Sequence, residues 1–132
     1  MTDVAAVLAG EDAAVYAYGL AAARLTGRER AAALDSMAAH RTQRDRLLAR
    51  AAASGASASP VPAAYDPPFP VADATAARRL AALVEDRLAG QWAGLAASST
   101  GQQRLADALV AQSCATRSVT WSGVAPVWSG AV

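Results

Sequence analysis

The sequence predicts an all-α protein, a four-helix bundle built from two antiparallel hairpins. Apolar side chains recur every three or four residues along four long segments, which is the period of an amphipathic helix. No stretch shows the alternation of apolar and polar residues that is typical of a β-strand. Alanine, the strongest helix former, accounts for 38 of the 132 residues. We expect residues 1–132 to form a single domain.

Capping residues and glycines set the bounds of the predicted helices. Thr2 is the expected N-cap of the first helix, and Gly27 can end that helix in the left-handed conformation. Asp73 is the expected N-cap of the third helix. The four helices are placed at about 3–25, 28–53, 73–97 and 102–121. The tail 122–132 contains glycine and proline and is expected to be non-helical.

Large apolar side chains define the face of each helix that we expect to be buried. On the second helix this face contains Leu34, Met37, His40, Arg44, Leu47 and Leu48. On the fourth helix it contains Leu105, Leu109, Val110, Cys114 and Val119. On the first helix the stripe from Val4 to Leu25 includes Glu11.

The segment 54–72 joins the second and third helices and contains five prolines. A polyproline segment of 19 residues could reach about 59 Å, whereas helices of this size are only about 35–39 Å long. The segment can therefore run the full length of a bundle, as the crossover of ferritin-like folds does. Tyr65 and Phe69 would hold it against the helices. A flexible linker in a simple up-down bundle is the alternative.

Glu11, His40 and Glu85 are polar residues on otherwise apolar faces. A buried carboxylate needs a partner, since an unpaired one costs several kcal/mol. Glu11 and His40 are nearly equidistant from the first turn, so they should meet inside an antiparallel hairpin. Glu85 lies at the edge of the apolar face of the third helix and could approach the same point.

These residues, together with the proline-rich crossover, resemble the ferritin-like superfamily. More narrowly, the chain is similar to DUF4439, an actinobacterial ferritin-like domain of unknown function. The similarity to DUF4439 rests on three short motifs: Ala13-Ala14-Val15-Tyr16-Ala17-Tyr18-Gly19, His40-Arg41 with Arg44-Asp45, and Pro68-Phe69-Pro70-Val71.

A di-iron centre in the superfamily that the chain resembles needs two lone glutamates and two Glu-x-x-His motifs. Glu11 and Glu85 could supply the former, and His40 the histidine of one motif, but Met37 stands three residues before it. The fourth helix has neither glutamate nor histidine. We therefore expect no bound metal, no cofactor and no catalytic residue. Glu11, His40 and Glu85 are expected to form a polar core cluster, which could be the remnant of a metal site.

Three functions remain open on this basis. The first is a structural or interaction module that has lost its metal centre and is not an enzyme. The second is a metal-dependent oxidoreductase with an incomplete carboxylate and histidine site. The third is a small-molecule binder that uses the space between the two hairpins.

Other features predict partners and location. Trp121 and Trp128 are large aromatic residues near the C-terminus and predict a contact surface, hence a homodimer. The net charge of +1 argues against nucleic acid as a partner, and we expect no membrane association and a cytoplasmic location. The arginine-rich stretch 41–50 is expected to be a solvated face. Cys114 is expected to be a core residue rather than a reactive thiol.

Overall fold

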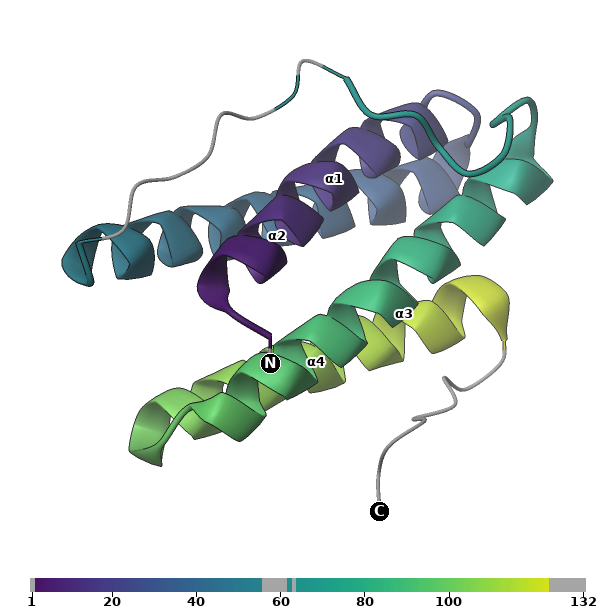
Figure 1. The fold of residues 1–132 in the computed structure, drawn as a ribbon. Helices are drawn as coiled ribbons and strands as arrows, with labels where there is room; N and C mark the ends of the chain where they lie inside the picture. The colour runs from purple at the N-terminus through teal and green to yellow at the C-terminus, as the bar shows by residue number, and fades with distance from the viewer. Residues whose placement is uncertain (1, 56–61, 63, 124–132) are drawn as a thin grey trace.

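Four α-helices make up the regular structure in the described part of the chain (Figure 1). They are α1 (Val4–Ala22), α2 (Gly27–Ala53), α3 (Ala74–Ser98) and α4 (Gly101–Ser122). The computed structural model describes residues 2–55, 62 and 64–123, and this part of the chain contains no strand. The predicted all-α, four-helix fold is therefore confirmed.

Aspartates cap the first helix of each hairpin. The carboxylates of Asp3 and Asp73 each accept a hydrogen bond of 2.8 Å from a backbone N–H in the first turn that follows. Asp73 is the predicted cap of α3. The prediction of Thr2 for α1 is wrong, because Asp3 is the residue whose side chain reaches the unpaired N–H groups of the first turn.

The first turn differs from the prediction by a few residues. α1 ends at Ala22, and Leu25, predicted to be helical, is buried in the turn itself. Gly27 does adopt a positive φ, 56°, but it begins α2 rather than ending α1. Gly101 occupies the same position at the start of α4, with φ 58°. Both hairpins thus turn through a threonine-glycine pair, because glycine enters this region without steric cost.

α2 and α3 start at the same end of the bundle, so the connection between them returns along its length (Figure 1). Glu29, in the first turn of α2, accepts a hydrogen bond of 2.9 Å from Arg78 near the start of α3. At the other end, Arg50 of α2 pairs with Asp107 of α4. The 27 residues of α2 span about 40 Å. The two hairpins are therefore joined by a long crossover and are not arranged as a simple up-down bundle.

The described part of the crossover lies against the helices. The rings of Tyr65 and Tyr16 are 5.8 Å apart, centroid to centroid. The guanidinium of Arg79 lies 4.2 Å from the centre of the Phe69 ring. The backbone carbonyl of Val71 accepts a hydrogen bond from Arg24 at 3.1 Å. Tyr65 and Phe69 thus make the contacts expected of anchoring side chains.

α1 and α3 pack closely where α1 carries a glycine. A Cβ atom at Gly10 would clash with the side-chain oxygen of Gln91 and would lie 3.0 Å from Leu88. The apolar core divides into two clusters, one around Trp92 and one around Tyr18. Between these clusters the core is polar, and this polar region is the candidate site described below.

Two of the predicted buried faces are wrong in part. On α4, Leu105 and Leu109 are 61% and 53% exposed, and Val119 is also exposed. Of the predicted face of α4, Cys114 is buried and Val110 is half-buried, and the other buried residues of α4 are Asp107, Ala111 and Ser118. On α2, Leu34 and Leu48 are exposed, and the buried residues are Ala33, Ser36, His40, Leu47 and Ala51. The predicted and the observed buried positions both have helical spacing. The prediction chose positions with large side chains, whereas the inner positions are filled mainly by small and polar residues.

By length and mean hydropathy alone, α1 could cross a membrane. The segment Val4–Ala22 has 19 residues and a mean hydropathy of 1.2 over its most apolar window. Its alanines raise this value, and it carries two acidic residues, Glu11 and Asp12. Here the helix contributes eight buried residues to the bundle, and buried Glu11 is hydrogen-bonded within the core. The same hydropathy is found in core helices that are rich in alanine.

Candidate functional site

His40 bridges two carboxylates at the centre of the bundle. Its Nδ1 lies 2.6 Å from Oε2 of Glu11, and its Nε2 lies 2.6 Å from Oε1 of Glu85. All three side chains are fully buried. They come from α2, α1 and α3, so the structure brings together the three residues that the sequence placed in one polar cluster.

The two carboxylates differ in their further hydrogen bonds. Oε1 of Glu11 accepts a hydrogen bond of 2.8 Å from the indole N–H of Trp92. Oε1 of Glu85 accepts two further hydrogen bonds, from the hydroxyl of Tyr18 at 2.7 Å and from Nε of Arg117 at 2.9 Å. Oε2 of Glu85 is buried and has no hydrogen-bond partner in the described part of the chain.

Arg117 completes the charge balance of this network. Its guanidinium comes from α4 and is partly exposed, whereas Glu85 is fully buried. Two carboxylates, one imidazolium and one guanidinium sum to zero charge. Buried charges that are paired and hydrogen-bonded in this way avoid most of the cost of leaving water.

The pKa values follow from these contacts. Burial alone would lower the pKa of His40, but its hydrogen bonds to Glu11 and Glu85 and their charges raise it to about 9. Burial favours a higher pKa for Glu85. The hydrogen bond and charge of His40, with the charge of Arg117, outweigh burial and lower that pKa. At neutral pH His40 is therefore an imidazolium that donates from both ring nitrogens.

The neighbouring hydroxyl and thiol are held in their neutral forms. Burial, followed by the charge of Glu85, raises the pKa of Tyr18 well above its ordinary value. The same two causes, burial first, raise the pKa of the Cys114 thiol. Cys114 is fully buried. A neutral, buried thiol is a poor nucleophile, so Cys114 behaves as a core residue.

These residues do not fit a metal centre. Both nitrogens of His40 are occupied by carboxylates, which leaves no lone pair for a metal ion. Arg117 places a fixed positive charge 2.9 Å from Glu85, where a dication would be repelled. Within residues 2–55, 62 and 64–123 there is no group of three or more histidine, cysteine or acidic side chains arranged to hold a metal. Binding a metal would require a proton to leave His40 and Arg117 to move.

A second polar cluster, which the sequence did not predict, joins α2 to α4. Nη1 of Arg50 donates to both carboxylate oxygens of Asp107, at 3.1 and 3.2 Å. Asp107 is 1% exposed and also accepts from Ser99 at 2.7 Å and from Gln103 at 2.8 Å. The expectation that the arginines of 41–50 form only a solvated face is therefore wrong for Arg50. The signal was weak, since one arginine among several showed no sequence feature that set it apart.

Trp121 takes part in the central network. Its side chain is half-buried, and its indole N–H donates a hydrogen bond of 3.0 Å to the hydroxyl of Tyr18. Trp128 lies outside the described residues. The sequence also did not identify Arg117 and Trp92 as members of this network. Their only sequence signal was their position on the inward sides of α4 and α3.

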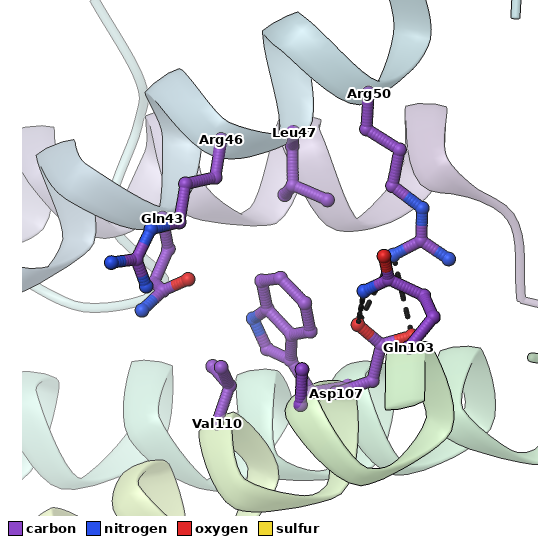
Figure 2. A pocket seen from close by; sticks show the side chains of 9 residues that line it. Gln43, Arg46, Leu47, Arg50, Gln103, Asp107 and Val110 are labelled. Carbon is purple, nitrogen blue, oxygen red and sulfur yellow. Dashed lines mark hydrogen bonds and ion pairs between the residues drawn. The ribbon is translucent and has the colours of Figure 1, made fainter. Parts of the chain in front are cut away.

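A pocket of about 280 Å³ lies between α2 and α4 (Figure 2). We call it the α2–α4 pocket. Its apolar lining consists of Leu47, Trp92, Ala106 and Val110. Gln43 and Arg46 lie at one end, and Arg50, Gln103 and Asp107 lie at the other (Figure 2).

The chain matches the family described as "Domain of unknown function (DUF4439)" over residues 3–130. No curated protein matches it. Among solved structures it is similar to the crystal structure of a conserved hypothetical protein, rv2844, from Mycobacterium tuberculosis. The TM-score is 0.86 and the sequence identity 26%, over 91% of this chain and 92% of that chain. The match over nearly the whole sequence confirms the predicted resemblance to DUF4439, and the chain belongs to the DUF4439 family.

Proposed function

We propose that this protein is a ferritin-like bundle in which a charge-balanced hydrogen-bond network stands where a metal centre would be, and that it acts as a structural or interaction module rather than as an enzyme. The crossover topology and the central position of Glu11, His40 and Glu85 support the ferritin-like part of the proposal. The loss of the metal centre is supported by one observation above all: both ring nitrogens of His40 are hydrogen-bonded to carboxylates.

The loss of a metal centre is argued from the donors themselves. In a working di-iron site each histidine offers a lone pair and each helix contributes a carboxylate. Here His40 donates protons from both nitrogens, and α4 contributes Arg117 to the network instead of a carboxylate. The positive charge of Arg117 substitutes for part of the charge that metal ions would supply.

Metal content tests this proposal directly. The protein is purified, incubated anaerobically with Fe(II), Mn(II) or Zn(II), desalted and measured by elemental analysis. We expect far less than one equivalent of metal per chain, with no difference between the wild type and Glu11→Gln. One or two equivalents of metal that disappear in Glu11→Gln would contradict the proposal and establish a metal-dependent oxidoreductase as the better candidate.

We also propose that the protein self-associates through the outer face of α4. Leu105 and Leu109 are one turn apart and are more than half exposed. Large apolar residues that lie together on a surface are typical of contact sites. We propose this face rather than the aromatic surface expected at Trp121 and Trp128, because the indole N–H of Trp121 is bonded to Tyr18 and Trp128 lies outside the described residues.

Light scattering coupled to gel filtration measures the oligomeric state. We expect a dimer for the wild type and a monomer for Leu105→Glu with Leu109→Glu. Thr42→Glu, an exposed substitution on α2, is the matched control and should remain dimeric. A wild type that elutes as a 13.4 kDa monomer at all concentrations would contradict the proposal.

A further inference from the structure

We propose that the α2–α4 pocket binds a small organic monoacid with an apolar body of about the size of one aromatic ring. This binding site is independent of the proposed loss of the metal centre. The inference rests on three features of the pocket: an apolar middle, an unpaired cation at one end, and a neutralised acid at the other.

The middle of the pocket offers apolar surface only. Trp92 and Leu47 are 3% and 1% exposed, so their side chains are held in place by the core. The indole N–H of Trp92 is already donated to Glu11, so the ring presents only its carbon surface to a ligand. Rigid apolar walls that carry a few polar groups at defined positions are typical of small-molecule sites.

Arg46 supplies the charge that selects an acid. In the described part of the chain, neither Arg46 nor Gln43 has a hydrogen bond or ion pair, in contrast to Arg50, which is bound to Asp107. Arg46 and Gln43 are one helical turn apart and lie at the same end of the pocket (Figure 2). A guanidinium binds a carboxylate through two parallel hydrogen bonds, and an amide beside it can donate a third.

The opposite end of the pocket limits the ligand to one acidic group. The guanidinium of Arg50 is already engaged by Asp107 and Ser99, so this end has no unpaired cation to hold a second acid. Gln103 lies there as well, with its amide nitrogen bound to Asp107. The volume of about 280 Å³ is at the lower limit of small-molecule sites, which excludes ligands as large as a nucleotide.

Phenylacetate is a suitable probe, and phenylacetamide is its uncharged counterpart of the same shape. Binding is measured by saturation-transfer NMR and by calorimetry at millimolar concentration. We expect phenylacetate to bind the wild type and phenylacetamide to bind at least about tenfold more weakly, since the charged contact is lost. Arg46→Gln should weaken phenylacetate binding at least about tenfold. Arg41→Gln removes an exposed arginine of the same helix outside the pocket and should leave binding unchanged.

A second variant tests the location without disturbing the core. Ala106 is exposed and lines the pocket, so Ala106→Trp should fill it and abolish binding while leaving the thermal unfolding midpoint unchanged. Three results would each overturn the inference: no binding of phenylacetate to the wild type, equal affinity for the acid and the amide, or binding to Ala106→Trp that equals that of the wild type.

Discussion

Nε2 of His40 lies 2.6 Å from Oε1 of Glu85, and neither side chain is exposed to solvent. The pair lies between the two apolar clusters of the core and links α2 to α3, which belong to different hairpins. The stability of the bundle should therefore depend on a contact that is electrostatic and sensitive to protonation. The predictions below test this contact, its charge state and the other buried polar groups.

Replacing His40 by alanine should be strongly destabilising. The substitution leaves Glu11 and Glu85 buried without the imidazolium, and breaking a buried ion pair on one side costs about 3–5 kcal/mol. Urea unfolding followed by circular dichroism measures the free energy of unfolding. Arg41→Ala, which removes an exposed residue next in sequence, should change it by less than about 0.5 kcal/mol. Equal effects of the two substitutions would show that the His40 network contributes nothing specific.

Stability should fall as the pH rises through about 9. His40 has a pKa of about 9 when folded and 6.5 as its ordinary value. A folded pKa above the unfolded one gives a stabilisation that is complete below pH 6.5 and is lost as the pH rises through about 9. The loss should be about 3 kcal/mol, from a shift of this size. Urea unfolding between pH 6 and 9.5 measures it.

The thiol of Cys114 complicates this titration and needs a control. Because burial raises the pKa of Cys114 in the folded protein, its ionisation in the unfolded chain also lowers stability at alkaline pH. The comparison is therefore made in a Cys114→Ala background. His40→Gln in that background should show a nearly flat profile over the same range. A decline as steep as that of the parent protein would assign the pH dependence to another group.

Cys114 should be inert to thiol reagents in the native protein. It is the chain's single cysteine and is fully buried, and burial raises its pKa. Its reaction with Ellman's reagent should occur only through unfolding, so the rate should rise steeply with urea. The unfolded protein in concentrated urea provides the control and should react at once with one equivalent. Rapid stoichiometric reaction of the native protein would contradict the buried position.

Asp107→Ala should destabilise the bundle by about 2–3 kcal/mol. Asp107 is buried and binds Arg50, Ser99 and Gln103, so its removal leaves their donors without an acceptor. Asp86→Ala, which removes an exposed aspartate of α3, should change stability by less than about 0.5 kcal/mol. Thermal and urea unfolding of both variants measure the difference. If Asp107→Ala is as stable as the wild type, this cluster does not help to hold α2 against α4.

The periodicity, the glycines and the proline-rich segment were enough to predict four helices, two hairpins and a long crossover. These features are local, because the period of a helix and the conformations of glycine and proline follow from a few neighbouring residues. The pairing of Glu11 with His40 was also predictable, since positions in an antiparallel hairpin are related by their distance from the turn.

Which face of α4 is buried and which arginines enter the core were decided only by the tertiary structure. Leu105 and Leu109 have the same helical spacing as Asp107 and Ala111, so the pattern in the chain does not distinguish the two faces. Asp107 can be buried because Arg50 reaches it from another helix. The sequence by itself determined the helices and their order. The burial of charged residues depends on partners that are distant along the chain, and only packing brings those partners together.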